Sequence, residues 1–245
     1  MQVSNSTRRK LILRTARGPK KFPLIGQRLM RKISDLDRLL KPLGLRVNLE
    51  SSDYARDLFC RLSLAAQRRA FQALSLYVET VEDLIRHRQS PFDARVFTWA
   101  FLKKAQLHPN SRTFESIQKD EIVEIFNRDF TQIFRSLSFF EKFDTPFFDL
   151  LILDRMTVLR SQSKLEEKIF LKMDACLRQK LGVEQLDLEE AEWGERFGTD
   201  PRHYLIRYKM MSSLLARGKR PGRISAVLMT SSVEMQLPQL QELAS

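Results

Sequence analysis

The first half of the chain carries two stripes of apolar residues at helical spacing. The first stripe begins at Leu24 and stops at Pro42 and Gly44, which interrupt helices. The second stripe is longer, keeps a 3.6-residue period and leaves most charged side chains on the opposite face. Its members are Leu62, Ala66, Ala70, Phe71, Leu74, Tyr77, Val78, Val81 and Ile85. Each stripe predicts an amphipathic helix.

A third helix is expected directly after these two. Ser90 can cap its N-terminus, Pro91 suits its first position, and Asp93 would lie near its positive end. The sequence His-Pro-Asn-Ser at 108–111 then interrupts the helical pattern. We therefore predict a helical region over residues 24–110.

The pattern changes after this break. Residues 121–126 roughly alternate and include β-branched side chains, which indicates a short strand, although a continued helix fits nearly as well. Residues 127–143 are rich in aromatic side chains and are predicted to be helical. The shared face of this helix would carry Phe130, Ile133, Phe134, Leu137 and Phe140. Further helices are expected over residues 147–153 and 165–181.

The end of the chain carries the strongest β pattern. Residues 203–215 alternate, and residues 224–233 form a second run of small and β-branched side chains. The segment between them, with sequence ARGKRPG, has the composition of a turn. We predict an antiparallel hairpin with one strand face formed by Tyr204, Ile206, Tyr208, Met210 and Leu214.

Two segments of this second half are similar to parts of PAS-type sensory domains. EIFNRDFTQIF, from residue 124, resembles the place where a PAS sheet leads into its helices, with Asn127 and Phe130 in the recurrent Asn-x-x-Phe position. Residues 202–235 resemble the closing PAS hairpin. The resemblance covers about residues 115–236, although the stretch 155–201 is long and acidic for a PAS domain.

The resemblance implies a five-stranded antiparallel sheet with helices on one face. The inner surface of such a sheet either holds a small ligand or is filled by side chains. The flavin-binding cysteine motif of light-sensing PAS domains is missing, no residue fits a haem ligand, and we expect no cofactor. The predicted fold class is α+β: a flexible basic arm (1–23), the helical region (24–110), a PAS-like domain (111–236) and a tail (237–245).

Charge is distributed unevenly along the chain. The formal net charge is +12, and residues 1–46 carry thirteen Lys or Arg against only Asp35 and Asp37. Such an arm can neutralise phosphates, which gives salt-sensitive and sequence-independent binding, or it can lie on anionic lipid. A solubilising leader, a wrongly chosen start codon or an organellar transit peptide are the alternatives. Residues 184–200 have a net charge of −6 and could dock against the arm.

The sequence offers no recognisable catalytic or metal motif. His87, His108 and His203 are far apart in sequence, and Cys60 and Cys176 form no CxxC pair. The acids around Glu189 have a spacing that fits no metal-binding loop. No apolar run is long enough for a membrane span. We predict a non-enzymatic, cytoplasmic protein without a bound metal.

Two functions are compatible with these patterns. The first is a signalling or regulatory protein that senses a small ligand or a protein partner in its PAS-like domain and transmits through the helical region, alone or as a homodimer. The aromatic residues expected to meet in that domain form either a ligand pocket or plain core: Phe126, Phe130, Phe134, Phe148, Tyr204 and Tyr208.

The alternative is a nucleic-acid-binding protein whose arm makes the phosphate contacts. The candidate residues for contact with nucleic acid, or with an anionic membrane, are Arg8, Arg9, Lys10, Arg14, Arg17, Lys20 and Lys21. The arm contains only one aromatic residue, Phe22, so stacking on bases would contribute little to its binding.

Overall fold

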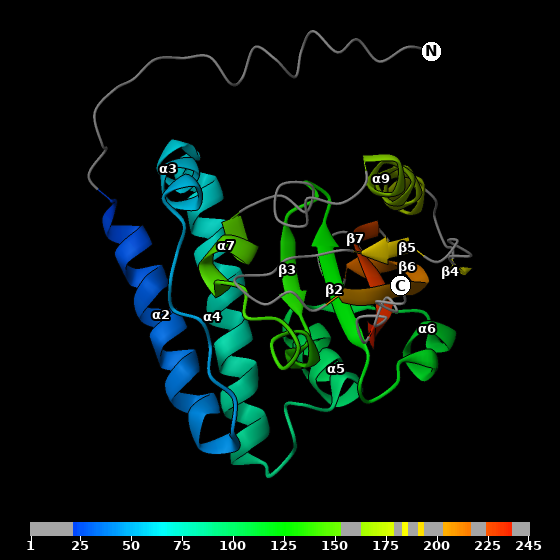
Figure 1. Cartoon of the computed structure of the whole chain (residues 1–245), viewed down its shortest axis with the longest axis horizontal. Coiled ribbons are helices and arrows are strands. Elements are labelled where there is room, and N and C mark those ends of the chain that lie inside the picture. The colour runs from blue at the N-terminus through cyan, green and yellow to red at the C-terminus, as the bar shows by residue number, and fades with distance from the viewer. Residues whose placement is uncertain are drawn as a thin grey trace, which may run out of the picture.

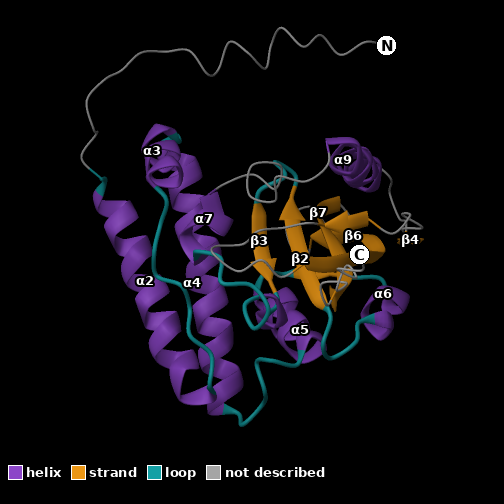
Figure 2. Ribbon diagram, in the orientation of Figure 1, coloured by secondary structure: helices purple, strands orange, loops and turns teal. Residues whose placement is uncertain are grey.

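The computed structural model describes residues 22–152, 163–178, 183–185, 191–193, 203–216 and 224–236. The expected α+β class is confirmed: helices dominate the N-terminal half and an antiparallel sheet the C-terminal half (Figure 1; Figure 2). The helical elements are α2 (Leu24–Leu40), η1 (Lys41–Leu43), α3 (Asp53–Arg61), α4 (Leu64–Arg86), α5 (Ala94–Lys104), α6 (Ser111–Ser116), η2 (Leu137–Phe139), α7 (Phe147–Ile152) and α9 (Ser163–Arg178). The strands are β1 (Leu107–His108), β2 (Ile122–Asn127), β3 (Gln132–Arg135), β4 (Val183–Gln185), β5 (Ala191–Trp193), β6 (His203–Ala216) and β7 (Ile224–Gln236).

Helices α2 and α4 confirm the two apolar stripes. They pack against each other along the edge of the molecule (Figure 1). Helix α2 gives way to η1, and Gly44 follows with a φ of 91°, a conformation that glycine adopts without strain. The buried side of α2 consists of Gly26, Leu29, Ile33, Leu36 and Leu40.

Serine caps determine where α3 and α4 begin. Ser52 accepts a hydrogen bond from the backbone of Ala55, and Ser63 accepts one from Ala66. The longer stripe therefore starts as a helix at Leu64, and Leu62 instead terminates α3, which the sequence analysis did not predict. The backbone N–H of Ser52 also donates to the buried carboxylate of Asp149 in α7, at 3.0 Å, which ties α3 to α7.

The expected start of the third helix is wrong by three residues. Asp93, not Ser90, is the N-cap of α5, because its carboxylate accepts from the backbone N–H groups of Arg95 and Val96 at 3.1 and 3.0 Å. Ser90 instead accepts from the N–H of Phe92 in the preceding turn.

The aromatic segment 127–143 forms a β-hairpin and a 3-10 turn, so the predicted helix there is wrong. The side-chain oxygen of Asn127 accepts from the backbone N–H groups of Asp129 and Thr131, at 2.9 and 3.0 Å, and this folds the chain back on itself. Strand β3 then pairs with β2, and η2 follows directly. The local hydrogen bonds of one asparagine thus override the apolar spacing.

The sheet is antiparallel, in the order β1-β6-β7-β2-β3, with β4 and β5 also pairing with β6. The predicted strand over residues 121–126 and the terminal hairpin are both confirmed as β2, β6 and β7. Strand β2 lies beside β7, so the first and last strands of the C-terminal half are neighbours.

A bulge at Lys209 changes which side chains share a face of β6. Tyr208 pairs with Ser231 and Met210 pairs with Thr230. Thr230 and Ser231 are adjacent, so they point to opposite faces of the sheet. Tyr208 and Met210 therefore lie on opposite faces. Leu214 pairs with Ala226 and shares the face of Met210, so the prediction of one face for Tyr208, Met210 and Leu214 is wrong.

Helices contact the sheet on both faces rather than on one. The hydroxyl of Ser213 donates to the carbonyl of Cys176 in α9 at 2.6 Å, whereas the hydroxyl of Thr113 in α6 donates to that of Ser212 at 2.7 Å. Ser212 and Ser213 are adjacent and face opposite ways, which defines an α9 face and an α6 face. Figure 1 shows the two helices on either side of the sheet.

The helical region and the sheet share one core. Buried apolar side chains of α2, α4, α5 and α7 form a continuous cluster with those of the sheet and α9. Strand β1, inside the predicted helical region, pairs with β6. Among the described helices, none is long and apolar enough to cross a membrane.

Candidate functional site

The aromatic pocket candidates whose side chains the structure describes do not meet in one cavity. Phe134 packs with its ring centroid 4.9 Å from that of Phe97 in α5, whereas Phe148 packs against Phe59 of α3 at 5.8 Å. Phe126 pairs with Val227, and the β7 ladder places it on the α9 face with Tyr208. Of the two remaining candidates, Phe130 lies in the β2–β3 turn and packs against the core, and Tyr204 is described only as backbone of β6.

The α9 face carries a buried ion pair. Glu124 of β2 and Arg135 of β3 lie opposite each other in the ladder, and their side chains are 4% and 6% exposed. Gln132 donates to the same carboxylate at 2.9 Å, and the Arg135 guanidinium carbon lies 4.0 Å from the ring centre of Phe139. Because a buried charge without its partner costs about 3–5 kcal/mol, the two residues constrain each other's position.

The same arginine is joined to the helical region through its backbone. The hydroxyl of Tyr77, in α4, donates to the carbonyl oxygen of Arg135 at 2.8 Å. Burial raises the pKa of the Tyr77 phenol well above its usual value of 10.0, although the nearby charge of Arg135 acts in the opposite direction. Tyr77 is therefore a neutral donor at physiological pH.

A small cavity lies beside this hydrogen bond. Its volume is about 20 Å³, enough for a single water molecule. Of the pocket candidates with described side chains, Phe134 alone lines it, and the other lining residues come from α4, β3, α7 and the segment before α7.

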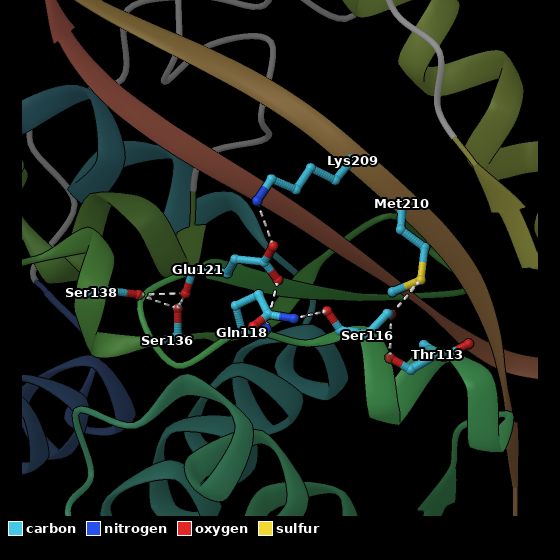
Figure 3. Close-up of polar contacts among 8 residues, drawn as sticks. All are labelled: Thr113, Ser116, Gln118, Glu121, Ser136, Ser138, Lys209 and Met210. Atoms are coloured by element: carbon cyan, nitrogen blue, oxygen red, sulfur yellow. Dashed lines mark hydrogen bonds and ion pairs between the residues drawn. The ribbon is translucent and has the colours of Figure 1, made fainter.

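A second polar cluster lies at the start of β2 (Figure 3). The buried Glu121 carboxylate accepts from Lys209 at 2.8 Å and from the backbone N–H of Gln118 at 3.0 Å. The backbone carbonyl oxygen of Glu121 accepts hydrogen bonds from the hydroxyls of Ser136 and Ser138 at 3.0 and 2.6 Å. The bulge residue Lys209 thus fixes the point at which the chain enters the sheet.

The hydroxyls of this region all serve structural bonds. Ser116 donates to the carbonyl of Thr113 and lies 3.2 Å from the sulfur of Met210 (Figure 3). In the part of the chain that the structure describes, none of the four hydroxyls drawn there is bonded to an imidazole or carboxylate that would activate it. Among the described residues, no group of three or more His, Cys, Asp or Glu could hold a metal ion.

The outer side of α2 and the segment that follows it are basic. Arg28 and Arg31 of α2, Lys41 of η1 and Arg46 after η1 are exposed, and none of them forms an ion pair within 4.0 Å among the described residues. Asp35, by contrast, pairs with Arg38. The seven candidates of the arm lie outside the described residues, as does most of the acidic segment 184–200, so docking between these two segments stays a hypothesis.

No known protein-family model matches the chain, and no curated protein matches it significantly.

Sequence reasoning missed the residues that organise both clusters. Glu121, Glu124, Arg135 and Lys209 are charged residues inside or beside apolar strands, and each pairs with another over 11 to 88 positions. The usable signal was Glu124 itself: a carboxylate in the middle of an apolar strand requires a buried partner.

Proposed function

We propose that this chain is a non-enzymatic regulatory protein that senses a small ligand or a protein partner on its PAS-like sheet and transmits through its helical region. The observation that carries the proposal is the double role of Arg135. Its guanidinium pairs with Glu124 on the α9 face, while its carbonyl accepts from Tyr77 of α4. A change at the ion pair therefore acts on the strand to which α4 is bonded.

The pairing of the strands supports the PAS-like part of this proposal. The two segments that carry the resemblance, around β2 and in the β6–β7 hairpin, are hydrogen-bonded to each other from Ile122↔Ser231 to Asn127↔Ala226. The resemblance implies that they belong to one antiparallel sheet. A bound molecule that offered an anion or a cation to the α9 face would compete with the Glu124–Arg135 pair.

The route to the helical region is short. Besides the Tyr77 hydrogen bond, Arg69 of α4 lies 3.7 Å from the carboxylate of Asp129 in the β2–β3 turn. Helix α4 also packs along α2 and α5, so a shift of β3 reaches three helices through α4.

We propose a reducing compartment such as the cytoplasm, because Cys60 and Cys176 are not joined in a disulfide.

Hydrogen exchange of the full chain tests the transmission. Glu124→Gln keeps the size of the side chain and removes its charge, so we expect faster exchange in β2 and β3 and also in the middle of α4. In the Tyr77→Phe background the added effect on α4 should be smaller, because only the Arg69–Asp129 contact remains, and Tyr54→Phe, at an exposed tyrosine of α3, serves as the control. Exchange changes confined to β2 and β3 would contradict the proposed route.

A second candidate function, nucleic-acid binding, is favoured by the exposed cations of α2. They continue the basic arm on a rigid helix, so phosphate contacts need not depend on the arm alone. Replacing Arg28 and Arg31 by Gln should reduce the salt dependence of binding to random duplex DNA by about two contacts. If the salt dependence of DNA binding did not change, α2 would make no phosphate contacts.

A further inference from the structure

Helix α5 presents a stripe of alternating cations and an aromatic residue to solvent. Arg95, Trp99 and Lys103 are spaced four residues apart, which places them along one side of the helix. Arg95 and Lys103 are exposed, and Trp99 is 40% exposed, although tryptophan is large enough to bury much of its surface in a core.

The side chains of this stripe contact Phe114 of α6 in a continuous row. The ring centres of Trp99 and Phe114 are 4.7 Å apart at an angle of 44°. The guanidinium of Arg95 lies 5.1 Å from the ring centre of Phe114, and the ammonium of Lys103 lies 5.9 Å from that of Trp99. These four residues, Arg95, Phe114, Trp99 and Lys103, form what we call the cation–aromatic row.

Further cations surround the row. Arg112 is exposed at the start of α6, and Lys119 is exposed next to the start of α5, where its carbonyl accepts from the N–H of Ala94 at 2.9 Å. Within the described part of the chain, neither of these residues nor Arg95 or Lys103 forms an ion pair. Lys104, the residue after Lys103, is by contrast bonded to Asp83 of α4.

We propose that the cation–aromatic row binds single-stranded nucleic acid. A base stacks on Trp99, and the surrounding cations contact the phosphates on either side of it. This combination of aromatic faces and a positively charged surface is how proteins hold single strands without sequence preference. The site does not depend on the sensory proposal, and it supplies the aromatic contacts that the basic arm lacks.

The energetics favour exchange of Lys103 for a base. A separation of 5.9 Å is near the outer limit of cation–π attraction, and such an exposed contact is weak. The ammonium can therefore leave the ring and move to a phosphate through its flexible stem. Because the bases of a duplex are already stacked and paired, a duplex gains the phosphate contacts but not the stacking contact.

Fluorescence of Trp99 provides a direct test. The chain has two tryptophans, so Trp193→Phe leaves Trp99 as the single reporter in the full-length protein. We expect oligothymidylate of about 12 nucleotides, within the usual range of site sizes, to quench this signal on binding. Trp99→Ala should weaken binding about tenfold or more, in line with the loss of one stacked base, and Trp99→Phe should restore part of it.

Three controls separate the row from other sources of affinity. Tyr54→Ala removes an exposed aromatic residue from α3, and binding should stay within about twofold of the unsubstituted protein. Heparin, a polyanion without bases, should bind Trp99→Ala and the unsubstituted chain equally. Replacing Arg8, Arg9, Lys10 and Arg14 by Gln should weaken the binding of oligothymidylate and of heparin to the same extent. This distinguishes the contribution of the arm to binding from that of the cation–aromatic row.

The proposal is overturned if oligothymidylate leaves Trp99 fluorescence unchanged, or if Trp99→Ala and Tyr54→Ala bind it equally well. If Trp99→Ala lowered the affinities for heparin and for oligothymidylate equally, the proposal would also be overturned, because the surface would then bind through charge alone. Circular dichroism of each variant shows whether it is folded, and Trp99→Phe keeps the test decisive if the alanine variant is not.

Discussion

At the scale of single residues, the hydroxyl of Tyr77 links helix α4 to strand β3 through one hydrogen bond. Its hydroxyl is one polar atom in an aromatic cluster whose ring centres lie 4.9 Å (Phe97), 5.5 Å (Phe147) and 5.7 Å (Phe134) away. Removing that atom leaves the buried carbonyl oxygen of Arg135 without this donor. The packing of the ring would be unchanged, so the effect of the hydroxyl can be measured separately.

Tyr77→Phe should lower the free energy of unfolding by about 1–2 kcal/mol at pH 7, as the loss of a buried hydrogen bond does. Since the pKa of Tyr77 is raised in the folded state, its contribution is fully present below the unfolded value of 10.0 and is lost as the pH rises above it. The difference between the two proteins should therefore shrink above pH 10. Urea unfolding at pH 7 and pH 10.5 checks both points, and a constant difference would contradict them.

Phe130 holds a strained backbone conformation in the β2–β3 turn. Its φ is 57°, in the left-handed region that glycine tolerates and an aromatic residue rarely adopts. The ring is half-buried against the core, so packing and backbone strain act in opposite directions. Comparing two small replacements separates these effects.

Phe130→Gly should be more stable than Phe130→Ala by about 1 kcal/mol, because both lose the ring but only glycine relieves the backbone. Thermal unfolding of the two variants measures the difference directly. The reverse order would show that the turn changes conformation when the ring is removed.

At the scale of elements, the face of each strand was predictable only where pairing is regular. Alternation along residues 203–215 located β6 correctly, but one extra residue at Lys209 exchanges the faces of the residues from Met210 to Leu214. The predicted helix over residues 127–143 failed for a related reason, since the bonds of the Asn127 side chain determine the turn. Helices α2 and α4, whose periodicity is uninterrupted, were predicted well.

Deleting Lys209 should cost less than deleting Arg207. Without Lys209, Tyr208 and Met210 keep their partners Ser231 and Thr230, and the strand loses the bulge and the ion pair to Glu121. Without Arg207, restoring regular pairing would move Tyr208 to the wrong face. We expect losses of about 1–2 kcal/mol, near that of a charged hydrogen bond, against more than 3 kcal/mol, near that of a displaced core aromatic. Equal melting temperatures would show that the bulge does not set the faces.

At the scale of the whole molecule, charge and packing divide the basic N-terminal segment into two parts. By charge alone, residues 1–46 form a single basic segment. The sequence divides this segment at residue 23 only through Pro23 and the apolar stripe that begins at Leu24. In the structure, α2 packs against α4 with Leu29, Ile33, Leu36 and Leu40 fully buried, while its outer side carries exposed arginines. Sequence could not show that the sheet, too, rests on this helical layer, because that packing depends on contacts between distant segments.

Truncations should separate the two parts. Leu29, Ile33, Leu36 and Leu40 are each fully buried, and at about 1.5–3 kcal/mol per side chain their burial is comparable with the whole stability of a typical domain. The fragment 47–245 should therefore lack cooperative thermal unfolding and bind a dye for exposed apolar surface. The fragment 22–245 should unfold at the same temperature as the full chain. If 47–245 unfolded cooperatively near that temperature, α2 would be an appendage, and its exposed cations could then be removed together with the arm without disturbing the core.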